Sequence, residues 1–307
     1  MSTVQPAVKK ESEATVLYHA NCLDGFGAAW SAWETLRDTA KYIPVQYGQP
    51  VPWNELEGTI YLVDFCYPPK QMVEIGYSTF SSGAKVVVID HHKTAIEAVA
   101  QFDWPEELAN TFEWVLDIEH SGAVLAWNYF HPDEDYMPYG LRLIEDRDLW
   151  KFDNPKTKRY CAALAIAPRN FESWHSCLVR QPRIDRLYFA GEVLLRQQEQ
   201  HLIALEETAY PYQITYTIGE VTTTVYVLAC NAPAWYASEL GNRLALKSNS
   251  GIGMVWQKIA RPDVIGTIKQ VSLRSVGEVD VEVIAKALGG GGHKHAAGYT
   301  LYGRQLE

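Results

Sequence analysis

The chain has 307 residues, of which 47% are hydrophobic and 21% are charged, a composition typical of a soluble protein with one large or two medium domains. Its 27 Lys and Arg residues are outnumbered by 37 Asp and Glu residues, giving a net charge of -10, so a long nucleic-acid scaffold is not expected as a partner. The five cysteines contain no Cys-x-x-Cys pair, and no stretch has the length of a membrane span, so we expect a cytoplasmic protein with reduced thiols and no membrane partner.

Strands and helices alternate over the first part of the chain. Apolar runs predict strands at 15–18, 42–46, 59–63, 85–89 and 113–116. Helical patterns follow several of these runs, and such alternation is typical of a parallel sheet with helices on both faces. We therefore expect an α/β domain over residues 15–185, preceded by a disordered tail at 1–14.

The pattern changes in the second part of the chain. A basic segment from Lys151 to Arg186 is interpreted as a solvated helical surface, with a phosphate-facing rim as the alternative. A long amphipathic pattern then predicts a connecting helix at 186–208. The elements predicted beyond it are strands at 212–217, 222–229, 253–259 and 266–274 and helices at 235–247 and 281–288. They predict a smaller α+β domain over residues 209–307.

Metal-compatible side chains follow several of the apolar runs. They are His19 with Asp24, Asp64, Asp90 with His91 and His92, and Asp146 with Asp148. Any one group could cap a helix or begin a loop, but the carboxyl ends of parallel strands converge on one crevice. Carboxylates with a few imidazoles suit manganese, magnesium or iron(II), and two such ions can activate water and hold the oxygens of a phosphoryl group. Asp64 is the expected bridging ligand because it stands alone after a central strand.

A glycine run near the end of the chain forms a second group of candidate residues. Backbone N–H groups of Gly290, Gly291 and Gly292 can approach a phosphate closely, and His293 and His295 can donate to the same anion. Arg274, on the strand predicted before them, is suited to bidentate phosphate contacts. A flexible turn and a solvated surface arginine are the alternative interpretations.

Taken in order, these motifs resemble the DHH phosphoesterase superfamily. The matching segments are His19…Asp24-Gly25, Val63-Asp64, Asp90-His91-His92, Asp148 and the glycine motif Gly289–Gly298, which resembles the C-terminal DHH-associated domain of nanoRNases and phosphoadenosine-phosphate phosphatases. The resemblance implies an N-terminal parallel-sheet DHH domain, joined by a helical linker to a smaller α+β domain that grips the substrate.

The resemblance also implies roles for individual residues. His19 and Asp64 would hold one metal ion. A second ion would be held by Asp24, Asp64, His91 and Asp148, with Asp146 as a competitor for Asp148. Asp90 would orient His91, and His92 would contact the scissile phosphate.

One residue departs from the family pattern. Cys22 stands where the first motif usually has a metal-binding Asp. Its thiolate or the neighbouring Asn21 carbonyl could complete the first site, or that site is weaker and its metal preference moves toward softer ions. A plain buried cysteine is the remaining alternative.

We therefore expect an enzyme that hydrolyses phosphoesters of short nucleotides, such as nanoRNA, linear dinucleotides or phosphoadenosine phosphate, with exonuclease-like action. Two divalent ions are expected as cofactors, manganese first, with magnesium, cobalt or iron as alternatives. An exopolyphosphatase-like phosphohydrolase and a nucleotide-binding module with impaired catalysis are the rival functions. The sequence leaves the oligomeric state open, with a homodimer as one option.

Overall fold

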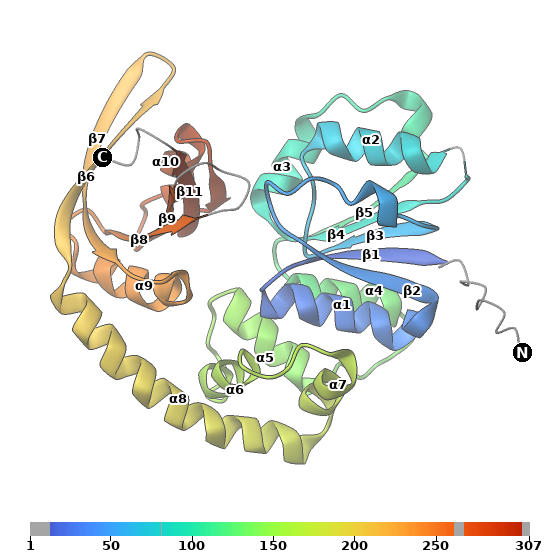
Figure 1. Ribbon diagram of the computed structural model, residues 1–307, viewed down its shortest axis with the longest axis horizontal. Coiled ribbons are helices and arrows are strands. Elements are labelled where there is room, and N and C mark those ends of the chain that lie inside the picture. Colours follow the sequence, from blue (N-terminus) through green and yellow to red (C-terminus); the bar gives the residue numbers. More distant parts are fainter. Residues whose placement is uncertain (1–12, 81, 261–266, 303–307) are drawn as a thin grey trace, which may run out of the picture. The chain divides into compact units, whose positions relative to one another are not determined.

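The computed structural model divides the chain into two compact units, Met1–Leu195 and Arg196–Glu307 (Figure 1). It describes residues 13–80, 82–260 and 267–302. The tail predicted at 1–14 falls, apart from its last two residues, outside this described part. Within the described part, no helix is both long enough and apolar enough to cross a lipid bilayer.

The first unit is built on a five-stranded sheet in which all strands are parallel, as predicted. The strands are β1 (Ala14–His19), β2 (Ala40–Val45), β3 (Thr59–Val63), β4 (Val86–Asp90) and β5 (Phe112–Leu116), in the order β2-β1-β3-β4-β5. Every residue of β4 is buried, which explains its continuous run of β-branched residues. The strand order reverses between β1 and β3, and α/β sheets bind ligands at the carboxyl ends of strands at such a point.

Helices cover both faces of this sheet (Figure 1). The four helices concerned are α1 (Leu23–Leu36), α2 (Pro69–Phe80), α3 (Lys93–Gln101) and α4 (Gly122–Phe130). Alternate residues of β1 face opposite sides: Val16 packs in a cluster with Ala28 of α1 and Ala126 of α4, whereas Leu17 packs in a cluster with Met72 of α2 and Val99 of α3.

A helical layer completes the first unit. It contains α5 (Tyr139–Asp148), α6 (Thr157–Leu164), α7 (Phe171–Val179) and the start of α8 (Gln181–Glu207), around a core that includes Trp30 and Trp174. The basic segment falls in this layer, where Lys156 pairs with Asp185 and Arg159 pairs with Glu192. These pairs favour the interpretation as a solvated helical surface. The long helix begins at Gln181, five residues before the predicted start.

The second unit is a smaller α+β fold with a six-stranded sheet of order β10-β11-β9-β8-β7-β6. Its strands are β6 (Tyr210–Ile218), β7 (Val221–Asn231), β8 (Ile252–Ala260), β9 (Thr267–Ser275), β10 (Gly291–His293) and β11 (Ala296–Tyr302), and its helices are α9 (Ala237–Lys247) and α10 (Val281–Ala287). Strands β7 and β8 are parallel, and the other neighbours are antiparallel. Strands β10 and β11 were not expected from the sequence, and Lys294 and His295 connect them.

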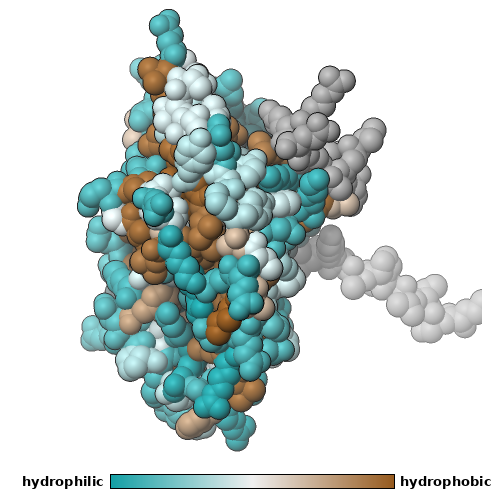
Figure 2. All heavy atoms as spheres, turned by 90° about the vertical axis from the view of Figure 1, so that its left-hand side faces the viewer, coloured by the Kyte–Doolittle hydropathy of each residue, from teal (hydrophilic) through white to brown (hydrophobic). Residues whose placement is uncertain are grey.

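Strands β6 and β7 form a long hairpin that carries no charged residue in either strand. Several of its apolar side chains are exposed, including Ile218, Val221 and Tyr226. Figure 2 looks at the molecule from the side on which Figure 1 draws this hairpin, and it shows apolar surface among the hydrophilic side chains.

Candidate metal centre

Three neighbouring strands bring polar side chains to the same edge of the parallel sheet. Tyr18 of β1 is aligned with Val63 of β3, and Val63 is aligned with Ile89 of β4. The residue that follows each of these is polar: His19, Asp64 and Asp90. The convergence expected from the sequence is therefore present in the structure.

Asp64 lies at the centre of the cluster and is 1% exposed. Its Oδ2 lies 3.4 Å from Nδ1 of His19, and its Oδ1 lies 3.2 Å from Nε2 of His91. The backbone of Asp64 is left-handed, with φ of 55°, a conformation that is uncommon for residues other than glycine. This turn directs the carboxylate into the crevice as the chain leaves β3.

His91 is the second shared residue, because its Nε2 faces three carboxylates. It lies 3.2 Å from Asp64, 3.6 Å from Asp24 and 3.5 Å from Asp148. These acids come from the start of α1, the end of β3 and the end of α5. Segments that are far apart in the sequence thus meet at one imidazole.

Asp24 is held by the amino terminus of a second helix. Its carboxylate accepts hydrogen bonds from the backbone N–H groups of Gly122 (2.6 Å) and Ala123 (3.1 Å), the first two residues of α4. Such N–H groups have no partner within their own helix, and they stabilise a negative charge. At Gly25, a Cβ would lie 2.2 Å from the carbonyl oxygen of His19, so only glycine allows this approach.

Asp90 contacts the ring of His92, whereas the family resemblance implied that it orients His91. Nδ1 of His92 donates to Oδ1 of Asp90 at 2.7 Å, and the same oxygen accepts the backbone N–H of His91 at 2.8 Å. Asp90 is fully buried. It therefore fixes the orientation of the His92 ring, while the ring of His91 faces the three metal-compatible acids.

The structure brings Asp148 into the cluster but not Asp146. The Asp146 carboxylate accepts hydrogen bonds from the backbone N–H groups of Asp153 (2.8 Å) and Asn154 (3.2 Å) and from the hydroxyl of Thr157. Asp146 thus closes the loop between α5 and α6. Its competing assignment as a metal ligand has no support from these contacts.

The electrostatics of the cluster are those of a site for a cation. Burial and the charges of Asp64 and Asp148 raise the pKa of Asp24 well above its ordinary value. Burial alone would lower the pKa of His91, but the facing carboxylates of Asp64, Asp24 and Asp148 raise it to about 10. Burial and the same three acids raise the pKa of the Cys22 thiol. Negative charge gathered in this way needs a positive partner.

The pKa of Asp64 is shifted in the opposite direction. Burial alone would raise its pKa, but the imidazoles of His19, His91 and His92 hold the pKa well below its ordinary value. This acid therefore stays ionised at the centre of the cluster.

The donor set fits divalent metal ions. Three groups each offer ligand atoms within 4.8 Å of one another: His19 with Cys22 and Asp64, Asp64 with His91 and His92, and Asp24 with His91 and Asp148. Both carboxylate oxygens of Asp64 and Nδ1 of His19 are buried without a hydrogen-bond partner in the structure. Buried polar atoms are normally paired, so these atoms are well suited to coordinate a cation.

Two contributors to the site were not expected from the sequence. Gly122 packs so closely that a Cβ there would lie 2.5 Å from Cβ of Asp64. Its only signal in the sequence is its place after Ser121, a residue type that commonly caps helices and whose side chain here accepts the N–H of Val124. Tyr47, just beyond β2, lies with its ring 5.5 Å from that of His19 and 6.0 Å from that of His92. No motif pointed to Tyr47.

The second unit aligns two of the predicted substrate contacts in one row across its sheet. His293 of β10 pairs with Ala296 of β11, and Ala296 pairs with Arg274 of β9. Paired residues of antiparallel strands share a face, so the imidazole and the guanidinium flank a small residue. Arg274 donates to the carbonyl of Leu273 and the hydroxyl of Ser238, each at 2.9 Å, and burial lowers its pKa to about 10.

The glycine run is more ordered than a flexible turn. Gly290 donates its N–H to the carbonyl of Ala285 at 2.8 Å, at the end of α10, and a Cβ on Gly290 would lie 2.0 Å from the carbonyl oxygen of Gly298. Gly291 and Gly292 pair with β11. The N–H of Gly290 is thus engaged within the fold, and close strand packing is a reason for this glycine in addition to any contact with a phosphate.

His295 is exposed and lies in the short segment between β10 and β11. Its Nδ1 is 3.1 Å from the hydroxyl of Ser275, and its carbonyl accepts the N–H of Ser275 at 3.2 Å. The structure places it outside the row that contains His293.

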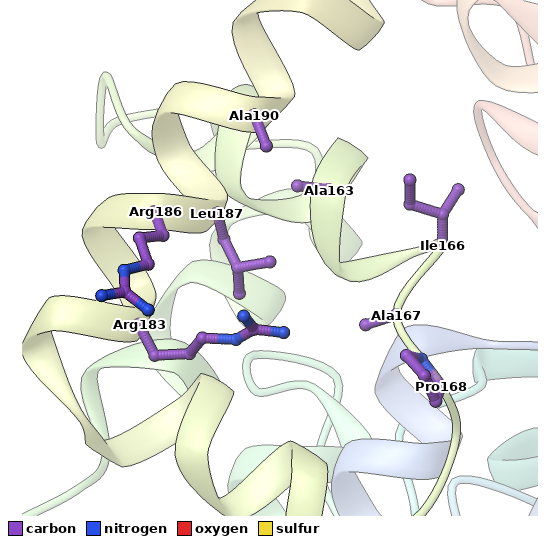
Figure 3. Close-up of a pocket in the computed structure, with 8 residues that line it drawn as sticks. All are labelled: Ala163, Ile166, Ala167, Pro168, Arg183, Arg186, Leu187 and Ala190. Carbon is purple, nitrogen blue, oxygen red and sulfur yellow. The ribbon is translucent and has the colours of Figure 1, made fainter.

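A separate hollow of about 320 Å³ lies in the first unit between α8, α6 and the loop that follows α6 (Figure 3). Its lining residues are Ala163, Ile166, Ala167, Pro168, Arg183, Arg186, Leu187 and Ala190. Figure 3 shows the side chain of Arg183 reaching toward the loop residues. None of the residues that line this hollow belongs to the metal-compatible cluster, which consists of His19, Cys22, Asp24, Asp64, His91, His92 and Asp148.

Comparison with known proteins agrees with the motifs. Residues 227–307 match the DHHA1 domain family. An uncharacterised protein, R106 of Acanthamoeba polyphaga mimivirus, is 30% identical over 312 residues, covering 96% of this chain and 69% of that protein. The oligoribonuclease NrnB of Bacillus subtilis is 27% identical over 245 residues, covering 72% of this chain and 54% of that protein.

Among solved structures, the pGpG-specific phosphodiesterase PggH of Vibrio cholerae has a TM-score of 0.42 and 9% identity, with 94% of this chain and 93% of that chain covered. With the ordered DHH motifs and the DHHA1 match on one polypeptide, the chain belongs to the DHH phosphoesterase superfamily, a family of metal-dependent hydrolases, and ends in a DHHA1 domain.

Proposed function

We propose that this protein is a phosphoesterase that uses two divalent metal ions, manganese first among them, to hydrolyse the phosphoester bonds of short nucleotides. The observation that carries the proposal is the overlap of the donor groups: Asp64 and His91 each belong to two of the three sets. A carboxylate shared between adjacent sets is what a pair of ions requires. Bound ions would activate water and neutralise charge on the phosphoryl oxygens.

The residues of the chain would divide the remaining tasks. His19 and Asp64 would hold one ion, and Asp24, Asp64, His91 and Asp148 would hold the other. His92 would donate a hydrogen bond to the phosphate, since Asp90 fixes its ring through Nδ1. Burial alone would lower the pKa of His92, but the charge of Asp90 raises it, which favours the protonated, donating imidazole.

Arg274 and His293 would grip another part of the substrate. Arg274 offers a planar set of donors suited to a phosphate, and its side chain is held by Ser238. Ala296 of β11, which pairs with both Arg274 and His293, is small. The relationship to NrnB, which is named an oligoribonuclease, supports short ribonucleotides as the substrate class. The net charge of -10 further favours short substrates over long strands.

The test is hydrolysis of pApA, short oligoribonucleotides and phosphoadenosine phosphate by the full chain with manganese. Asp64→Ala should abolish turnover because it removes the shared ligand. Asp133→Ala removes an exposed acid of the same unit and should leave turnover unchanged. Binding of these nucleotides without product release would favour a nucleotide-binding module, and unchanged turnover in Asp64→Ala would contradict the assignment of the site.

A further inference from the structure

Cys22 differs from the other four cysteines in its surroundings. Cys66, Cys161, Cys177 and Cys230 are each at most 3% exposed and lie within apolar clusters. Cys22 is partly exposed and belongs to none of the apolar clusters of the described residues. An apolar packing role, which accounts for the other four, does not account for this one.

The sulfur of Cys22 lies among metal-compatible atoms. Its Sγ, a ring nitrogen of His19 and a carboxylate oxygen of Asp64 are all within 4.8 Å of one another. Cys22 immediately precedes α1, yet its side chain makes no capping hydrogen bond to that helix. Asn21, the residue before it, has a left-handed backbone with φ of 59°, so the chain turns sharply where it presents the sulfur.

An independent observation points to a ligand at the same place. Asp64 is 1% exposed, and neither of its carboxylate oxygens has a hydrogen-bond partner in the structure. Nδ1 of His19 is also buried and makes no hydrogen bond among the described residues. A cation among the three side chains would engage atoms that contact other side chains at ion-pair distance, Asp64 with His19 at 3.4 Å and with His91 at 3.2 Å, but make no hydrogen bond among the described residues.

We infer that Cys22 is a metal ligand that makes this half of the centre a His-Cys-Asp site, selective for zinc, cobalt(II) or iron(II) over manganese and magnesium. Thiolate sulfur favours the softer ions, whereas oxygen-rich sites favour manganese and magnesium. The other half, with Asp24, His91 and Asp148, offers nitrogen and oxygen donors without sulfur. The centre is thus a mixed one, with one softer and one harder site, and the manganese of the proposed function would occupy the harder site. This inference rests on the metal centre of the proposed function.

The test uses the full chain, freed of metal by a chelator and titrated with cobalt(II). A cobalt–thiolate bond gives a near-ultraviolet charge-transfer band, so the wild-type protein should develop this band and reach saturation at one equivalent. Cys22→Ser and Cys22→Asp should lose it. Cys230→Ala, which changes a buried cysteine of the other unit, should keep it. Zinc should abolish the band in competition, and manganese at the same concentration should not.

Affinity gives a second readout. Cys22→Ser should weaken zinc binding by more than about tenfold, because loss even of a residue that only orients a ligand costs about 10–100-fold. Cys22→Asp, which restores a carboxylate, should bind manganese at least as well as the wild type does.

The possible results separate this inference from the proposed function. Stoichiometric cobalt binding without the band would overturn the role of Cys22, even if manganese supports hydrolysis. A band that persists in Cys22→Ser would also overturn it. If the wild-type protein binds none of these metals, both this inference and the dinuclear centre fail.

Discussion

Replacement of Gly122 by alanine tests how closely the structure fixes Asp64. The added Cβ would lie 2.5 Å from Cβ and 2.7 Å from Oδ1 of Asp64. Ordinary carbon contacts are about 3.5–4.0 Å, so Asp64 or the start of α4 must move by about 1 Å. The N–H of Gly122 that holds Asp24 would move with it.

A displacement of about 1 Å at a reacting centre costs about 100-fold in rate, which corresponds to about 2.7 kcal/mol of transition-state stabilisation. We therefore expect Gly122→Ala to lower kcat/KM for short oligoribonucleotides about 100-fold. Overpacking should also lower the free energy of unfolding by about 1–3 kcal/mol. The assays are steady-state hydrolysis with manganese, manganese affinity by calorimetry, and denaturant unfolding.

The matched control is Asn170→Ala. Asn170 caps α7 by accepting the N–H of Ser173 at 2.9 Å, and loss of such a cap costs about 1 kcal/mol. This variant lowers stability in the same unit without touching the centre, so its kcat/KM should stay unchanged below the melting temperature. If Gly122→Ala retains kcat/KM within about threefold of the wild type, with unchanged manganese affinity, then the Gly122–Asp64 contact does not fix the position of Asp64.

Three further predictions follow from the same cluster. Manganese at about 100 times its Kd should stabilise the fold by about 2.7 kcal/mol. In calorimetric scans this should raise Tm by about 5–11 °C for a unit of this size, and an unchanged Tm would argue against a metal site. Without metal, the free energy of unfolding should fall as pH rises from about 6.5 to about 10, because His91 in the folded protein, with its pKa raised to about 10, keeps a proton that the unfolded chain loses. This dependence on pH should be weaker in His91→Gln. An equal slope in both proteins would contradict the role of His91. Asp146→Ala should lower the free energy of unfolding by about 1.5–3 kcal/mol and leave manganese affinity unchanged. Asp148→Ala should weaken manganese binding and leave the free energy of unfolding unchanged. If calorimetry shows weaker manganese binding in Asp146→Ala and not in Asp148→Ala, the two assignments must be exchanged.

The first unit was predictable because its strands are short β-branched runs, each with a polar residue at its carboxyl end. Val86–Ile89 followed by Asp90 is the clearest case. In a parallel sheet these ends converge, so the meeting of His19, Asp64 and the Asp90–His92 segment followed from their positions after β1, β3 and β4. The two-unit α/β and α+β architecture followed in the same way.

The parts that could not be predicted depend on contacts between side chains. Asp146 and Asp148 are two residues apart at a helix end, and residues at that spacing point in different directions; only the course of the loop to Thr157 shows which one faces His91. Which ring Asp90 orients depends on side-chain torsions that the sequence does not display. Strand β10 contains Gly291, Gly292 and His293, which lack the β-branched side chains by which strands are recognised.

The left-handed backbone of Asp64 lowers the stability of the fold, because this conformation is strained for any residue other than glycine. Glycine would adopt this conformation with less strain, but it would also remove the carboxylate that pairs with His19 and His91, so the two effects on folding oppose each other. A selection for heat-resistant variants that ignores turnover would therefore gain less from glycine at this position than the backbone strain alone suggests. An aspartate here thus combines a strained backbone with a carboxylate placed where a metal centre can use it.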